Sequence, residues 1–80
     1  MGEDNKIIAC IVRDGQRPGT SEVEFIGKNG YVAGVGLDKV ISANVVGDQI
    51  VVMCESQLTK NRWINIYDAY TCRHINVLPA

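Results

Sequence analysis

The sequence predicts an all-β fold of seven short antiparallel strands. Ile and Val together supply 19 of the 80 residues and Leu supplies 3. This preference is typical of pleated, half-buried strands, because β-branched side chains are stiff and less favourable in helices. No stretch repeats apolar residues at helical spacing over three turns, whereas Gly, Asn, Asp and Pro interrupt short apolar segments at regular intervals. The interruptions therefore separate strands.

The predicted strands follow these apolar segments along the chain. They span Lys6–Arg13, Glu22–Gly27, Tyr31–Leu37, Val40–Val46, Gln49–Glu55, Arg62–Tyr67 and Cys72–Leu78. The first and fifth strands are apolar at odd and even positions alike, so we expect both faces of each to be covered.

Two of the connections carry the residues of tight hairpins. Asn29-Gly30 is a strong hairpin signal because both central residues of a type I′ turn take positive φ, and Gly47-Asp48 suits a primed turn for the same reason. The segments Asp14–Ser21 and Ser56–Asn61 are longer and polar. We expect them to be loops.

The sixth and seventh strands form a hairpin whose two faces differ. With Tyr67 opposite Cys72, one face is expected to be aliphatic and the other to be aromatic and polar. Aromatic planes beside amides are typical of carbohydrate and base-stacking sites, and equally of subunit interfaces. The candidate binding residues, for a ligand or a partner chain, are Trp63, Asn65, Tyr67, His74 and Asn76.

The residue patterns favour a non-catalytic protein with no metal and no cofactor. Cys72 and His74 are expected to share a strand face, but their backbone positions lie about 7 Å apart, too far for an easy thiol–imidazole hydrogen bond. No third group that would orient them can be identified. Cys-x-His supplies two of the roughly four ligands that structural zinc requires. Gly34 and Gly36 lie within a strand, where no phosphate cradle forms.

Charge and composition restrict the partners and the compartment. Eight basic and nine acidic residues give a formal charge of -1 without a basic run, which disfavours nucleic acid as a partner. The apolar run Ile7–Val12 is too short for a membrane span, and the polar start Met1–Lys6 lacks a signal-peptide pattern. Three cysteines within apolar segments indicate reduced thiols. We therefore expect a cytoplasmic protein.

Residues 6–37 and 49–78 share one plan, at an offset of 41 to 43 residues: strand, polar loop, strand, short turn, strand. A period in the forties built of short antiparallel strands is typical of β-propeller blades. Residues 63–75, with alternating apolar positions, Tyr67-Asp68 and a Thr-containing turn, resemble the outer hairpin of a blade in WD-repeat and kelch-type propellers. This resemblance implies two blade-like repeats in one domain, residues 1–80. It transfers no functional residue, because the Gly-His pair is missing and Gly27 stands in the place of Asp68 in the first copy.

Seven strands are one fewer than two four-stranded blades need. Two incomplete blades would leave apolar faces and strand edges in water, and a ring of identical chains would cover both. The alternative architecture is a small closed β-barrel or sandwich. The expected function is a binding or assembly module that self-associates through sheet faces or edges. The alternative is a small-ligand protein, with carbohydrate as one candidate, that binds through Trp63, Tyr67 and His74.

Overall fold

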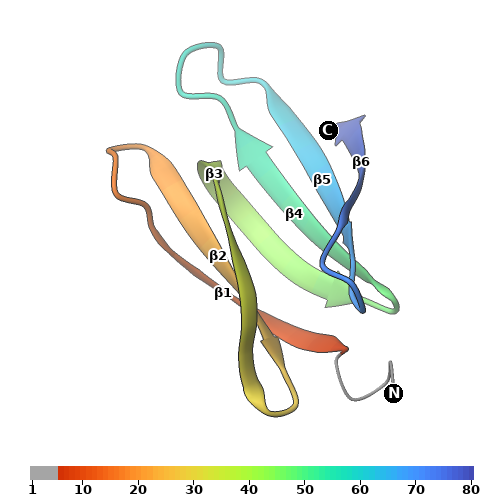
Figure 1. Ribbon diagram of the computed structural model, residues 1–80. Coiled ribbons are helices and arrows are strands. Elements are labelled where there is room, and N and C mark those ends of the chain that lie inside the picture. Colours follow the sequence, from red (N-terminus) through yellow and green to blue (C-terminus); the bar gives the residue numbers. More distant parts are fainter. Residues whose placement is uncertain (1–5) are drawn as a thin grey trace.

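The structure, a computed structural model that describes residues 6–80, is one antiparallel sheet of six strands (Figure 1). The strands are β1 (Ile7–Asp14), β2 (Thr20–Gly27), β3 (Gly30–Val46), β4 (Gln49–Glu55), β5 (Arg62–Asp68) and β6 (His74–Pro79). Each pairs with the next along the chain, so their order in the sheet is their order in the sequence. The all-β, antiparallel prediction is confirmed. The prediction of a domain beginning at Met1 extends beyond the described residues.

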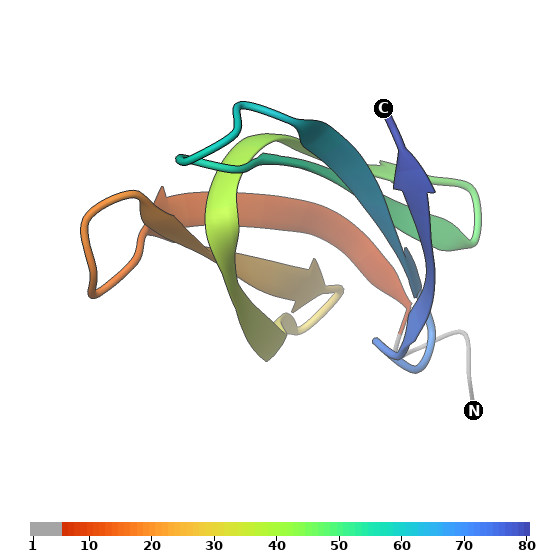
Figure 2. The same ribbon diagram turned by 90° about the horizontal axis from the view of Figure 1, so that it is seen from above.

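The sheet has six strands and not the predicted seven, because Tyr31–Leu37 and Val40–Val46 are parts of one strand, β3, of 17 residues. Asp38 and Lys39 separate the two apolar segments, but neither takes the positive φ of a tight turn, and the chain stays extended through them. β3 pairs with β2 through its first half and with β4 through its second. Figure 2 shows β3 arching between the two halves of the molecule.

The sheet is open, so the expected alternative of a closed barrel or sandwich is wrong. Among the described residues β1 pairs only with β2 and β6 only with β5, which makes both of them edge strands. The sheet curls far enough for the Ile7 N–H to donate a hydrogen bond to the Ala69 carbonyl, at 2.7 Å. No strand ladder continues from that contact.

The core lies on one face of the curled sheet. Alternate residues of β2 and β4 supply most of it, as the two-residue period of a strand requires. The buried apolar side chains are Ile7, Val23, Phe25, Ile50, Val52, Cys54, Tyr67 and Ala69. The Phe25 and Tyr67 rings meet edge to face with centroids 5.4 Å apart, and this contact joins the two halves of the sheet.

The expectation that the first predicted strand is covered on both faces is wrong. In β1 only Ile7 is buried, and Ile8, Ile11 and Val12 are exposed. A run that is apolar at odd and even positions alike indicates burial on both faces of an interior strand. β1 lies at an edge of the sheet, where no neighbouring element covers it. In β4 one face is buried and the other is half-buried.

Both predicted hairpins form, with turns that differ from each other. Gly27 pairs with Gly30 across Lys28 and Asn29, and of these four only Gly30 has positive φ, at 114°. The first turn is therefore not the predicted type I′. In the second hairpin Gly47 alone has positive φ, at 60°, which is the pattern of the primed type II′ turn.

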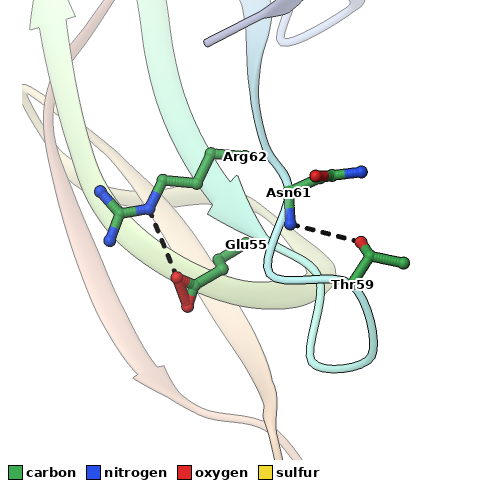
Figure 3. A network of polar contacts seen from close by, with 4 residues as sticks. All are labelled: Glu55, Thr59, Asn61 and Arg62. Atoms are coloured by element: carbon green, nitrogen blue, oxygen red, sulfur yellow. Dashed lines mark hydrogen bonds and ion pairs between the residues drawn. The ribbon is translucent and has the colours of Figure 1, made fainter.

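Two longer loops lie near one end of the sheet (Figure 1). The β4–β5 loop is held by Ser56 Oγ, which accepts the Leu58 and Thr59 N–H groups, and by an ion pair between Arg62 Nε and Glu55 Oε2 at 3.3 Å (Figure 3). Gly19 of the β1–β2 loop, at φ 78°, lies so close to Gln57 that any Cβ there would collide with the amide. The two loops therefore touch. Residues 6–80 contain no helix long and apolar enough to cross a membrane.

Candidate functional site

Four of the five predicted binding residues share the core face of the β5–β6 hairpin. Trp63, Asn65 and Tyr67 alternate along β5, and His74 pairs with Tyr67 across the hairpin. The amide oxygen of Asn65 accepts a hydrogen bond from His74 Nε2 at 3.1 Å. The Asn65 Nδ2 donates to Cys54 Sγ at 3.5 Å, so both the oxygen and the nitrogen of this amide are held by hydrogen bonds.

The fifth residue, Asn76, lies on the opposite face. The register shifts by one residue between Ile66 and Tyr67, so that Asn76 pairs with Ile66 and Val77 pairs with Asn65. A one-residue shift moves every following side chain to the other face of a strand. The predicted pairing of Tyr67 with Cys72 is also wrong, because Tyr67 pairs with His74. Cys72, at φ 62°, belongs to the turn and precedes β6.

Tyr67 is a core residue and cannot serve as an open binding surface. It is only 5% exposed and packs between Phe25 and the His74 ring, whose centroid lies 5.1 Å away. Burial, followed by the nearby Cys54, raises the pKa of the Tyr67 phenol. The burial of Tyr67 therefore separates the half-buried Trp63 from the exposed His74 at the other end of this face.

At that end Trp63 and Asn65 line an open groove of about 510 Å³, here called the Trp63 groove. Its other walls come from the β1–β2 loop, including Arg17, from the start of β2, and from the middle of β3, including Leu37 and Asp38. The sequence analysis does not single out Asp38 as a site residue and predicts the Arg17 segment only as a polar loop. No local pattern marks either residue, because curvature of the sheet brings them to Trp63.

The Trp63 groove contains charges without internal partners. Residues 6–80 form two ion pairs, Arg13 with Glu24 and Arg62 with Glu55, and neither pair includes the groove residues Arg17, Glu22 and Asp38. Asp38 lies near enough to the core to contribute, after burial, to the raised pKa of the Cys54 thiol. The groove therefore offers one aromatic plane, two amides, Gln16 and Asn65, one cation, Arg17, and two anions, Glu22 and Asp38.

The two edge strands form a second candidate site. β1 exposes Ile8, Ile11 and Val12, and every residue of β6 is exposed, including Ile75, Val77 and Leu78. Charged side chains lie only at the end of β1, at Arg13 and Asp14. These strands present apolar side chains beside unpaired backbone groups, which is the usual template for strand addition.

The thiols lie in surroundings that keep them protonated. Burial raises the pKa of Cys10, Cys54 and Cys72, with a further rise at Cys72 from the nearby Asp68. Nucleophilic cysteines usually have lowered pKa values. His74 bonds to Asn65 and not to a thiol. In the described part of the chain, no three or more His, Cys, Asp or Glu side chains gather as a metal site would need.

No protein-family model, no curated protein and no solved structure matches this chain.

Proposed function

We propose that this chain is a non-catalytic assembly module that associates with copies of itself through the edge strands β1 and β6. The observation that carries the proposal is the exposure of apolar side chains along both edges. Ile8 is 60% exposed on β1 and Ile75 is 51% exposed on β6. Soluble monomers usually protect such edges with charges, prolines or covering elements.

Edge protection is limited to the strand ends. The interior of β1, from Ile7 to Val12, carries no charge, and in β6 the only breaker is Pro79 at its last position. The core is small, with eight buried apolar side chains among residues 6–80. A chain of this length buries only about 60% of its unfolded surface, so burial of the edges against a second copy adds stabilisation that the monomer lacks.

The favoured arrangement is head to tail, with β6 of one copy beside β1 of the next, continuing the sheet as blade-like repeats. The internal repeat supports it, although the buried positions match at an offset of 42 residues and not at the 41 that sets Gly27 against Asp68. At 42, Phe25 corresponds to Tyr67 and Gly27 to Ala69, and all four are buried. Contacts between different edges close into a ring when the rotation between copies permits. A closed ring of this kind would arrange the copies as the blades of a propeller are arranged, in line with the resemblance of residues 63–75 to a blade hairpin.

The test is the absolute molar mass by light scattering on a sizing column, over an about tenfold range of concentration. We expect a mass of two or more chains. A monomer that unfolds cooperatively at every concentration would contradict the proposal.

Matched lysine substitutions locate the contact. Ile8→Lys places a charge on the β1 edge, and Val46→Lys, at 61% exposure beside the β3–β4 turn, places the same charge on an interior strand. We expect the mass to fall for Ile8→Lys and for Val77→Lys on β6, and to stay unchanged for Val46→Lys. Equal effects of all three would show that assembly does not use the edges.

A ligand site made of Trp63, Tyr67 and His74 together is not part of this proposal, because the burial of Tyr67 leaves no shared open surface. Trp63 remains accessible in its own groove.

A further inference from the structure

The Trp63 groove combines features that the assembly proposal does not use. Its volume of about 510 Å³ lies within the range of roughly 300–1,000 Å³ common for ligand sites. It lies between the β1–β2 loop, the middle of β3 and β5, away from the apolar stretches of β1 and β6. Binding of a ligand in the Trp63 groove is therefore independent of contacts between copies through the edge strands.

The polar groups of the groove suit a neutral ligand with many hydroxyl groups. Arg17 supplies charged donors, the carboxylates of Asp38 and Glu22 supply charged acceptors, and neither kind of group is engaged in an ion pair within residues 6–80. Neighbouring hydroxyls of one ligand donate and accept at once, and so satisfy both groups. A polyanion would gain from Arg17 but would meet the carboxylates of Asp38 and Glu22, and the chain as a whole carries a charge of -1.

Trp63 adds the apolar plane that such a ligand needs. It is the only tryptophan of the chain and is half-buried, with one part fixed in the core and another lining the groove. A pyranose ring presents a C–H face that packs on an aromatic plane while its hydroxyls point to the sides. A purely apolar ligand would leave Arg17 and Asp38 desolvated without partners.

The walls of the groove are already held in place. The β1–β2 loop is closed by three hydrogen bonds: Gly15 N–H to Thr20 C=O at 2.9 Å, Thr20 N–H to Arg17 C=O at 3.1 Å, and Thr20 Oγ1 to Arg17 C=O at 2.7 Å. Asn65 is held by Cys54 and His74. A preformed site loses little conformational entropy on binding.

From these observations we infer that the Trp63 groove is a carbohydrate-binding site for a pyranose mono- or disaccharide, with Trp63 as the stacking surface and with Arg17 and Asp38 as hydrogen-bonding partners of the hydroxyls.

The emission of the single tryptophan reports binding directly. We would titrate the protein with glucose, N-acetylglucosamine, cellobiose, maltose and diacetylchitobiose, and separately with adenosine monophosphate. We expect a saturable change in Trp63 emission with at least one sugar, at a Kd of about 1 mM or tighter. The absence of saturation with every sugar, or saturation with the nucleotide alone, would overturn the inference.

A matched pair of variants assigns the contact. Asp38→Asn removes the charge of a groove residue, whereas Asp48→Asn makes the same change at an exposed position in the β3–β4 turn. We expect Asp38→Asn to weaken sugar binding about tenfold, the usual value of a hydrogen bond to a charged group, and Asp48→Asn to leave it unchanged. Equal affinities for the two variants, with the fold intact by circular dichroism, would overturn the inference. The molar mass of each variant is measured alongside, so a failure of binding is distinguishable from a failure of assembly.

Discussion

At the residue scale, Asp68 organises the turn between β5 and β6. Its Oδ1 accepts the backbone N–H groups of Tyr70 at 2.7 Å and Thr71 at 3.0 Å. These bonds, with Thr71 contributing most, lower the pKa of the Asp68 carboxyl below 3.8. They also guide the chain to Cys72, which takes a positive φ that costs energy for a side chain with a Cβ.

This arrangement predicts a stability that depends on pH. A carboxyl whose pKa is lower in the folded state contributes stability above its unfolded pKa, and loses it as the pH falls through the folded value. Asp68→Asn keeps an oxygen acceptor but cannot titrate, so we expect a stability close to wild type at pH 7 and a smaller loss between about pH 4 and pH 2.

The measurement is the urea midpoint by circular dichroism at both ends of that range. Asp48→Asn is the control, since the described structure gives its carboxylate no side-chain hydrogen bond. An acid-induced loss in Asp68→Asn as large as in the control would contradict the role of Asp68.

At the scale of elements, β2 contributes the side chain that joins the two halves of the sheet. Phe25 is fully buried and meets Tyr67 of β5, although β2 and β5 are not neighbours in the sheet. Curvature of β3 makes this contact possible, because β3 pairs with one half at its start and with the other at its end.

Phe25→Ala is therefore expected to be severely destabilising. Loss of a buried Phe costs about 3–5 kcal/mol, a large part of the roughly 4–12 kcal/mol available to a domain of this size. Tyr31→Ala, at a position 65% exposed on β3, is the control and should cost about 0.5 kcal/mol or less. Urea unfolding followed by circular dichroism compares the two, and similar midpoints would show that the core does not depend on the contact between halves.

At the scale of the whole molecule, the open sheet couples folding to association. If copies join through their edges, only the folded state binds, and mass action makes the melting temperature rise with chain concentration. We expect that rise in the wild type over an about hundredfold range of concentration, and its loss in Ile8→Lys. Thermal unfolding by circular dichroism measures it. A wild-type melting temperature independent of concentration would contradict the coupling.

Part of the candidate site was predictable and part was not. Trp63, Asn65, Tyr67 and His74 were expected to share a face because side chains alternate along strands, and they do. Asn76 was assigned to the wrong face because the register shift between Ile66 and Tyr67, which leaves Ile75 of β6 without a partner, has no pattern in the sequence. Arg17 and Asp38 were not assigned to the site because no spacing relates either of them to Trp63.

The sequence by itself determined the all-β class, the antiparallel hairpins and the limits of most strands. These features depend on short-range preferences: β-branched side chains in strands, and glycine where a turn needs positive φ. Only the tertiary structure decided that two predicted strands are one bent β3, that β1 is an exposed edge, and that Trp63 lies beside Arg17 and Asp38. The physical reason is that sheet curvature and strand order depend on packing between distant segments, which no local pattern records.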